Sequence, residues 1–266
     1  MSADSRSQLH ADLHREQLVQ ERERNRASAL RILGLLLERF RAASALDVGC
    51  GLGTWLAVAR GLGVADVYGV DGEWLDTSLL EIDAALAMRC DLERGFSLGR
   101  RFDLVICLEV AEHLHEPAAD TLVSSLVAHG DVVLFSAAIP FQGGHHHVNE
   151  QFADYWAERF SRHGYRSLDF IRPRIWTERE VHWWLRQNVL VYAHDRALEH
   201  HPELRRGLEA PRMVSVVLPE VYLDRMRSAQ QVQQAHQQLI DLLSSGGSFR
   251  VERSPDGQLV VTREPD

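Results

Sequence analysis

The stretch ALDVGCGLGTW, residues 45–55, combines an apolar run, an aspartate and three glycines at alternate positions. Glycine occurs where the backbone takes a conformation that other residues avoid, or where another group must approach it closely. A glycine turn between a strand and a helix presents backbone N–H groups, which bind polar or anionic parts of a ligand. Asp47, Gly49, Gly51 and Gly53 are therefore the first candidate binding residues.

Asp71 places a second carboxylate at the end of an apolar run, VYGVD. In open parallel sheets, ligands bind at the carboxyl ends of the strands. A carboxylate at the end of the second strand commonly accepts hydrogen bonds from ribose hydroxyls. The glycines and Asp71 together predict a site for an adenosine-type ligand.

A histidine-rich segment, SAAIPFQGGHHHVNEQ at residues 136–151, offers groups for proton transfer. His145, His146 and His147 stand in a row, and Glu150 follows. Imidazole and carboxylate groups can take a proton from a reacting hydroxyl, so these four residues are candidate catalytic residues. A divalent metal held by His145, His147 and Glu150 is an alternative that we favour less, because their spacing is not diagnostic of a metal site.

Apolar runs and amphipathic segments alternate along the chain. They predict the strands and helices that position the candidate binding and catalytic residues. We expect strands at 44–49, 66–71, 86–91, 101–110, 131–139, 165–171 and 187–194, with helices at 54–63, 116–130 and 149–164. Such alternation predicts an α/β fold, a Rossmann-like seven-stranded and mostly parallel sheet with helices on both faces.

Segments at the two ends extend this domain. We expect an N-terminal helical segment at 1–41, the main domain at 42–218, and a C-terminal helix and hairpin at 219–266. The helix is glutamine-rich, and its heptad pattern is irregular. It either joins two copies in a homodimer or packs on its own domain. Pro255-Asp256-Gly257 predicts the turn of the hairpin.

The composition of the chain limits which classes of binding partner and which cellular location we expect. The net charge of −9 argues against a general affinity for nucleic acid or an anionic membrane. Cys50, Cys90 and Cys107 adjoin apolar runs, which indicates buried thiols. No apolar run is long enough to span a bilayer, and residues 1–27 lack the apolar stretch of a secretory signal. We expect a cytoplasmic protein that acts on a small molecule.

Two further motifs lie near the ends of the third and fourth predicted strands, CDLE at 90–93 and FDLVICLEVAEHL at 102–114. With LDVGCGLGTW and GVD they resemble the class I S-adenosylmethionine-dependent methyltransferases, of the type 11/12-like kind, over about residues 44–193. The resemblance implies a shared set of cofactor contacts. The methionine part of the cofactor would be cradled by Asp47, Gly49, Gly51 and Gly53, and its end would be lined or followed by Leu108, Glu109 and His113. The ribose would be held by Asp71. The adenine would be flanked by Gly72 and Trp74, and its amino group would meet Asp91 and Leu92.

The segment at 139–176 resembles a subgroup of these enzymes that is associated with sugars and glycoconjugates. Aromatic residues concentrate in and beyond it, and aromatic faces suit the apolar faces of sugars. We therefore expect an O-methyltransferase for a small hydroxylated acceptor, such as a sugar or sugar conjugate. Two alternatives remain open: methylation of nitrogen or carbon in another metabolite, and a non-catalytic module that binds the cofactor and docks a partner.

Overall fold

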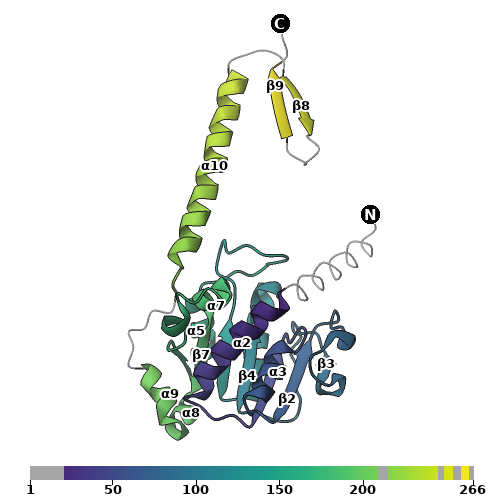
Figure 1. Cartoon of the computed structure of the whole chain (residues 1–266), viewed down its shortest axis with the longest axis vertical. Helices are drawn as coiled ribbons and strands as arrows, with labels where there is room; N and C mark the ends of the chain where they lie inside the picture. Colours follow the sequence, from purple (N-terminus) through teal and green to yellow (C-terminus); the bar gives the residue numbers. More distant parts are fainter. Residues whose placement is uncertain (1–20, 209–214, 245–248, 254–258, 264–266) are drawn as a thin grey trace. The chain divides into compact units, whose positions relative to one another are not determined.

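The computed structural model describes residues 21–208, 215–244, 249–253 and 259–263. The chain divides into two compact units, Met1–Val216 and Val217–Asp266. The first unit holds one large sheet and the helices that cover it, and the second holds a long helix and a two-stranded hairpin (Figure 1).

Seven strands form the large sheet in the order β3-β2-β1-β4-β5-β7-β6. Strands β1 to β5 are parallel, and β7 runs antiparallel to both of its neighbours. This confirms the predicted Rossmann-like, mostly parallel sheet. The strands are β1 (Ser44–Val48), β2 (Asp66–Asp71), β3 (Ala87–Arg89), β4 (Leu104–Leu108), β5 (Val132–Ser136), β6 (Tyr165–Leu168) and β7 (Leu190–His194).

Both faces of the sheet are buried, because alternate side chains of its apolar strands point to opposite sides. In β4, Leu104 and Ile106 join one core cluster, whereas Val105 and Cys107 join the other. Helices α2 (Arg22–Leu37) and α3 (Thr54–Gly61) pack together on the first face (Figure 1). Helices α4 (Ala119–His129) and α5 (Ala153–Ser161) cover the second. The shorter helices are α6 (Arg172–Ile175), α7 (Trp183–Asn188), α8 (Asp195–His200) and α9 (Pro202–Arg205).

Strand order reverses between β1 and β4, which lie side by side although two strands separate them in sequence. Ligands of open parallel sheets bind beyond the carboxyl ends of the strands at such a switch point. The glycine turn follows β1, and the segment that carries Glu109 follows β4. The fold therefore brings these two motifs to one crevice.

Most expected elements are shorter than the sequence pattern indicated; β4, for example, was expected at 101–110 and spans Leu104–Leu108. The last strand begins at Leu190, because Gln187 and Asn188 finish helix α7. Strand β6 ends at Leu168, because the Asp169 carboxylate pairs with Arg172 at 2.6 Å in the first turn of α6. Of the N-terminal helix, Arg22–Leu37 is helical, and the earlier part of the prediction lies outside the described residues.

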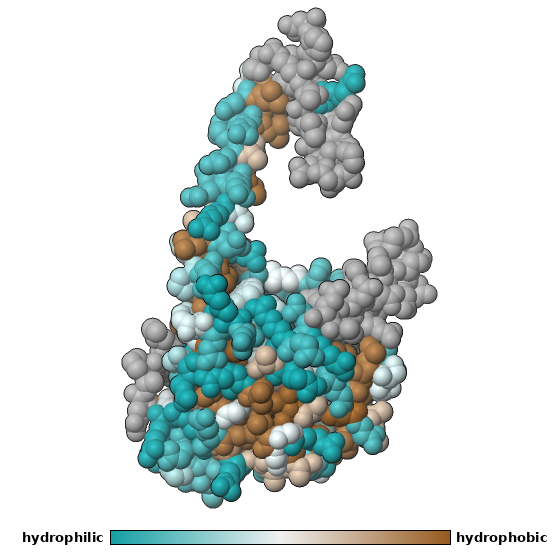
Figure 2. All heavy atoms as spheres, viewed as in Figure 1, coloured by the Kyte–Doolittle hydropathy of each residue, from teal (hydrophilic) through white to brown (hydrophobic). Residues whose placement is uncertain are grey.

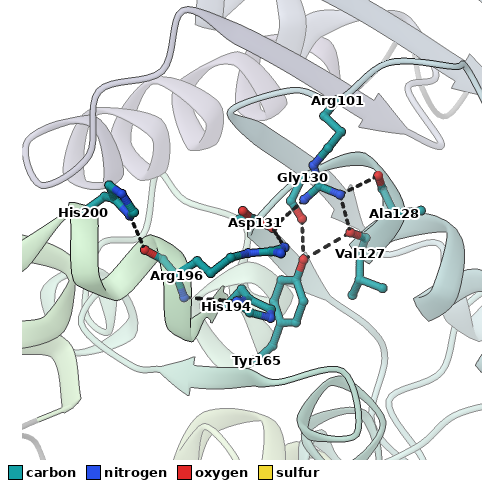
Figure 3. A network of polar contacts seen from close by, with 9 residues as sticks. All are labelled: Arg101, Val127, Ala128, Gly130, Asp131, Tyr165, His194, Arg196 and His200. Carbon is teal, nitrogen blue, oxygen red and sulfur yellow. Dashed lines mark hydrogen bonds and ion pairs between the residues drawn. The ribbon is translucent and has the colours of Figure 1, made fainter.

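A polar network fixes β6 and β7 at the opposite, amino-terminal edge of the sheet (Figure 3). The Tyr165 hydroxyl donates to the Gly130 carbonyl at 2.5 Å. Arg101 donates to the Ala128 carbonyl at 2.7 Å and also pairs with Asp131, to which Arg196 donates at 2.9 Å. Burial raises the pKa of Tyr165 to about 12, so its hydroxyl remains a donor. These groups hold the antiparallel strands to the end of α4 and lie away from the crevice.

The second unit contains α10 (Pro219–Ser244) and an antiparallel hairpin of β8 (Phe249–Arg253) and β9 (Leu259–Arg263). These elements match the predicted helix and hairpin, and the predicted turn at 255–257 lies outside the described residues. Figure 2 shows α10 as a largely hydrophilic helix with scattered apolar side chains. Its exposed large apolar residues are Tyr222, Leu223, Met226, Val232, Leu239 and Ile240. Within the described ranges, no helix combines the length and the apolar character needed to cross a membrane.

Candidate functional site

The glycine turn after β1 is a tight loop in which all three glycines are left-handed. Gly49, Gly51 and Gly53 have φ values of 79°, 54° and 71°. The Gly49 N–H donates to the Val70 carbonyl at 2.8 Å, which ties the turn to the end of β2. A Cβ atom on Gly49 would lie 2.3 Å from Cγ2 of Val110. Glycine is thus required at this position by the segment after β4, before any ligand is considered.

Asp71 joins the turn to the second strand. Its Oδ2 accepts the Gly51 N–H at 2.6 Å, and its Oδ1 accepts the Gly72 N–H at 2.7 Å. A carboxylate can accept more than two hydrogen bonds, so ribose hydroxyls can bind beside these amides. Trp74 packs its ring over Gly72 and remains 56% exposed. A flat aromatic face therefore lies next to the Asp71 carboxylate.

Asp47 is buried at the end of β1 with 3% of its surface exposed. Among the described residues, its Oδ2 has no hydrogen-bond partner. Burial, with a smaller contribution from the Asp71 charge, raises the pKa of Asp47 to about 8. A buried carboxyl group in this state is stabilised in its charged form by a nearby cation. The ammonium and sulfonium groups of the expected cofactor supply such a charge, so the residues of this crevice fit that cofactor.

The CDLE motif lies beside Asp71, because the Cys90 N–H donates to the Asp71 carbonyl at 2.8 Å. Asp91 is exposed; it accepts the Glu93 N–H at 3.0 Å and pairs with Arg94 at 3.2 Å. Leu92 is buried against the second core cluster. The structure thus brings the predicted adenine-side residues to the same edge as the predicted ribose acid.

Glu109 follows Leu108, the last residue of β4, and takes a left-handed conformation with φ of 54°. This conformation is uncommon for a residue other than glycine, and it often marks a functional position. Gln142 donates to its Oε2 at 3.0 Å, and Asn188 donates to its Oε1 at 3.4 Å. Burial raises the pKa of Glu109, and these hydrogen bonds oppose the rise.

A 3₁₀ turn, η3 (Ala111–His113), directs Glu112 into the protein. Glu112 is 0% exposed, and its carboxyl group faces the backbone N–H of Ala138 and the carboxyl group of Glu109. Burial raises the pKa of Glu112 well above its usual range, and the neighbouring Glu109 carboxylate raises it further. The turn therefore holds two acids and a histidine, Glu109, Glu112 and His113, at the carboxyl end of β4.

The histidine-rich loop is closed over this turn by backbone hydrogen bonds. The N–H groups of Val148 and Asn149 both donate to the Glu112 carbonyl, at 2.9 and 3.1 Å. The imidazole of His147, whose side chain is 12% exposed, lies edge-to-face against His113 with ring centroids 5.0 Å apart. Two segments that are distant in sequence thus form one cluster.

Glu150 holds the loop in shape. It accepts the Phe141 N–H at 2.8 Å and the Gly143 N–H at 3.1 Å, and its Oε1 lies 2.9 Å from Nδ1 of His147. His145 and His146 are exposed. Of the three consecutive histidines, His147 is therefore the one that the structure places against the acids after β4.

Sequence reasoning did not single out Glu112, Gln142 or Asn188. The signal for Glu112 was present, since EVAEH places two acids and a histidine directly after a buried strand. Gln142 and Asn188 gave no such signal, because they reach Glu109 only through the folded chain. Asn188 also lines a small pocket with the buried side chains of Trp156 and Tyr192.

Comparisons with known proteins identify the family and the fold. A family model described as a methyltransferase domain matches residues 19–191 of the 266. The structure of Streptomyces venezuelae DesVI superposes with a TM-score of 0.51 at 19% identity, covering 70% of this chain and 98% of that one. The sugar N-methyltransferase KedS8 from Streptoalloteichus sp. gives a TM-score of 0.47 at 19% identity, over 63% of this chain and 87% of that one. No curated protein sequence matches significantly.

Proposed function

This chain belongs to the methyltransferase-domain family and is an enzyme that uses S-adenosylmethionine, and on that premise we propose that it methylates a hydroxyl group of a small acceptor. S-adenosylmethionine supplies a methyl group that is already activated by a positively charged sulfur. The protein's own task is to align the donor and the acceptor, and to remove the proton of the acceptor hydroxyl.

The residues after β1, β2 and β3 are proposed to hold the donor. Asp71 would accept the ribose hydroxyls beside its two amide contacts, and Asp47 would face the positively charged methionine end. Trp74 would lie against the adenine, with Asp91 at its amino group. These roles agree with the burial of Asp47 and Asp71 and with the open face of Trp74.

The observation that carries a hydroxyl acceptor is the polar cluster at the end of β4. A nitrogen acceptor needs only modest help from a base, whereas a hydroxyl gains roughly 10²–10⁴ in rate from a group that takes its proton. His147 lies in this cluster with its Nδ1 against Glu150 at 2.9 Å, the arrangement of an oriented imidazole base. We therefore propose His147 as the catalytic group of the loop and Glu150 as its positioning residue, with His145 and His146 at the exposed rim.

A sugar or sugar conjugate is the proposed acceptor class. It is supported by the resemblance of residues 139–176 to glycoconjugate-associated enzymes. Trp156 and Tyr192, beside Asn188, are core side chains that are each 1% exposed, so they offer no aromatic surface to an acceptor. Methylation of nitrogen or carbon remains the second candidate, since the cofactor half of the site does not distinguish among acceptors.

The reaction is tested with donor that carries an isotopically labelled methyl group and with paired acceptors. Hexoses, 6-deoxyhexoses and their nucleotide-linked forms are each compared with an amino analogue of the same configuration. We expect label on oxygen and release of S-adenosylhomocysteine. Label on nitrogen or carbon alone would contradict a hydroxyl acceptor, and cofactor binding without any transfer would support a binding module.

The loop is tested by His147→Ala, which should lower kcat about 10²–10⁴-fold and leave the affinity for S-adenosylhomocysteine within twofold. His163→Ala is the matched control, because His163 is exposed at the end of α5 and away from the cluster. Equal turnover in both variants would exclude His147 from the chemistry.

Self-association through α10 is also proposed, because six large apolar residues of this helix are exposed, and exposed apolar surface is typical of interaction sites. Truncation after Leu218 should then lower the mass measured by light scattering. A full-length protein that is already monomeric at high concentration would contradict this proposal.

A further inference from the structure

Three side chains at the end of β4 have the arrangement of a metal site. Ligand atoms of Glu112, His113 and His147 all lie within 4.8 Å of one another. They come from two segments, η3 and the histidine-rich loop, which backbone hydrogen bonds to the Glu112 carbonyl hold together. The spacing in sequence did not reveal this set, because the third member is contributed by the fold.

Glu112 gives an independent reason to expect a cation. Its side chain is fully buried, and the groups that face its carboxylate are the backbone N–H of Ala138 and the carboxyl group of Glu109, neither of which carries a positive charge. A buried carboxylate without a neutralising charge is strongly unfavourable, and buried charges are normally paired or bound to a metal. The second carboxylate nearby, that of Glu109, adds repulsion that a cation between or beside the two would offset.

His147 is oriented as a metal ligand would be. Its Nδ1 lies 2.9 Å from Glu150, a carboxylate that is itself fixed by two backbone N–H groups. A carboxylate at Nδ1 favours the proton on that nitrogen and leaves the lone pair on Nε2. Metal-binding histidines almost always donate their second ring N–H to a carboxylate, a carbonyl or water in this way.

We propose that Glu112, His113 and His147 bind one divalent cation of the first transition series, with Glu109 beside it. Two imidazoles and a carboxylate favour ions such as Mn²⁺, Co²⁺ or Zn²⁺ over Mg²⁺, which prefers oxygen ligands alone. Glu150 is the positioning residue for His147. The alternative to a bound cation is a single proton shared by the carboxyl groups of Glu109 and Glu112. The two acids would then form a hydrogen-bonded pair with a structural role.

The role of the cation deepens the proposed function and rests on it, whereas cation binding itself does not. A hydroxyl bound to a divalent cation loses its proton more readily. The hydroxyl proton then passes to solvent, the acceptor oxygen forms the new C–O bond, and the C–S bond breaks with its electron pair remaining on sulfur. With the cation bound, His147 would be its ligand, and this role would replace the base role proposed for His147; the hydroxyl acceptor stays the same.

Cation binding is measured directly on the full-length protein, after removal of metals with a chelator and dialysis. Co²⁺ is titrated while its visible ligand-field absorption is recorded, and Mn²⁺, Zn²⁺ and Mg²⁺ are titrated by calorimetry. We expect one Co²⁺ per chain and Mg²⁺ binding at least tenfold weaker than Mn²⁺. Absence of Co²⁺, Mn²⁺ and Zn²⁺ binding up to millimolar concentration, or binding of Mg²⁺ alone, would overturn the proposal.

Variants locate the ion. Loss of a group that only supports a ligand typically costs about 10–100-fold in metal affinity, so Glu112→Gln and His147→Ala, which each remove a ligand, should weaken Co²⁺ binding by at least about that factor. His163→Ala, with its exposed imidazole outside the cluster, should bind Co²⁺ as the parent does. Binding of S-adenosylhomocysteine by each variant shows that the domain remains folded. Equal Co²⁺ affinity in the parent and in Glu112→Gln would mean that the ion sits on surface histidines, and the proposal would fail.

Methyl-transfer assays separate this inference from the proposed function. If the chelated enzyme loses turnover and Mn²⁺ or Co²⁺ restores it, the cation has the proposed role. Full turnover of the metal-free enzyme would overturn that role and leave His147 as the base. A protein that binds one Co²⁺ per chain through Glu112 but methylates no hydroxyl would contradict the proposed function and retain the site.

Discussion

Replacing Asp47 with asparagine should change how the stability of the cofactor-free protein depends on pH. Asp47 is buried, and its pKa rises from 3.8 to about 8 in the folded state because of burial and the nearby Asp71 charge. Asparagine has nearly the same shape and no charge at any pH. The variant therefore removes one titration and preserves the packing at the end of β1.

The sign follows from which state holds the proton. Between pH 4 and 8 the unfolded chain has lost the Asp47 proton and the folded protein retains it, so the unfolded state binds fewer protons. The free energy of unfolding then falls as the pH rises, by about 1.4 kcal/mol per unit. From pH 5 to pH 7, Asp47 alone should contribute a loss of about 2–3 kcal/mol, and the loss should level off above pH 8.

Urea unfolding of the parent and Asp47→Asn at pH 5, 6 and 7 measures this difference. Relative to the parent, the variant should gain about 2–3 kcal/mol between pH 5 and pH 7. Asp66→Asn is the control, because Asp66 is exposed at the start of β2 and pairs with Arg100 at the surface. Its free energy of unfolding should change with pH as that of the parent does. Parallel curves for Asp47→Asn as well would refute the assignment of a buried, uncompensated carboxyl group at this position.

The same group should respond to the cofactor. If the ammonium of S-adenosylhomocysteine lies beside Asp47, it favours the charged carboxylate, and binding at pH 7 releases up to one proton. Calorimetry in phosphate and in Tris buffer reports this release as a difference in the observed binding enthalpy. Asp47→Asn should abolish the difference, and a parent protein without it would place the ammonium elsewhere.

Three further changes test the site and its support. Gly49→Ala should lower the free energy of unfolding by about 2–4 kcal/mol, because Gly49 has a left-handed φ and a Cβ atom there would contact the segment after β4. Gly34→Ala in helix α2 is the control: its Cβ atom would meet nothing within 4 Å, so it should be neutral or stabilising. Similar urea midpoints for the two variants would contradict the prediction for Gly49. Asp71→Ala should weaken S-adenosylhomocysteine binding by on the order of 3 kcal/mol in calorimetry, and an affinity within twofold of the parent would remove Asp71 from the ribose. Trp156→Ala should lower the unfolding free energy by about 3–5 kcal/mol, because the side chain is buried against Phe135; a loss below 1 kcal/mol would be inconsistent with that packing.

Several features of the site depend on local rules, and these were predictable. Gly49, Gly51 and Gly53 stand at alternate positions because a tight turn between a strand and a helix needs left-handed residues. The apolar run of β4 predicted a strand that is buried on both faces. Alternation of strands and helices then predicted the parallel sheet, and with it the edge at which the motifs meet.

Other features depend on contacts between segments that are far apart in the chain. Gln187 and Asn188 read as the start of a strand, but they end helix α7, where Asn188 donates to Glu109 and Gln142. The identity of one histidine among three was likewise undecided, since each has the same chemistry in the sequence. Burial and a partner separate them: His147 is packed against Glu150, and His145 is exposed.

The sequence by itself determined the sheet, the glycine turn and the acids at the strand ends, because each follows from burial periodicity or from backbone conformation over a few residues. Only the tertiary structure decided what stands around Glu112. Its partners come from the loop that follows β5, and the hydrogen bonds of Val148 and Asn149 to the Glu112 carbonyl set the distance between the two segments. A cluster of this kind is a property of two chain segments held in register, and no local pattern in either segment contains it.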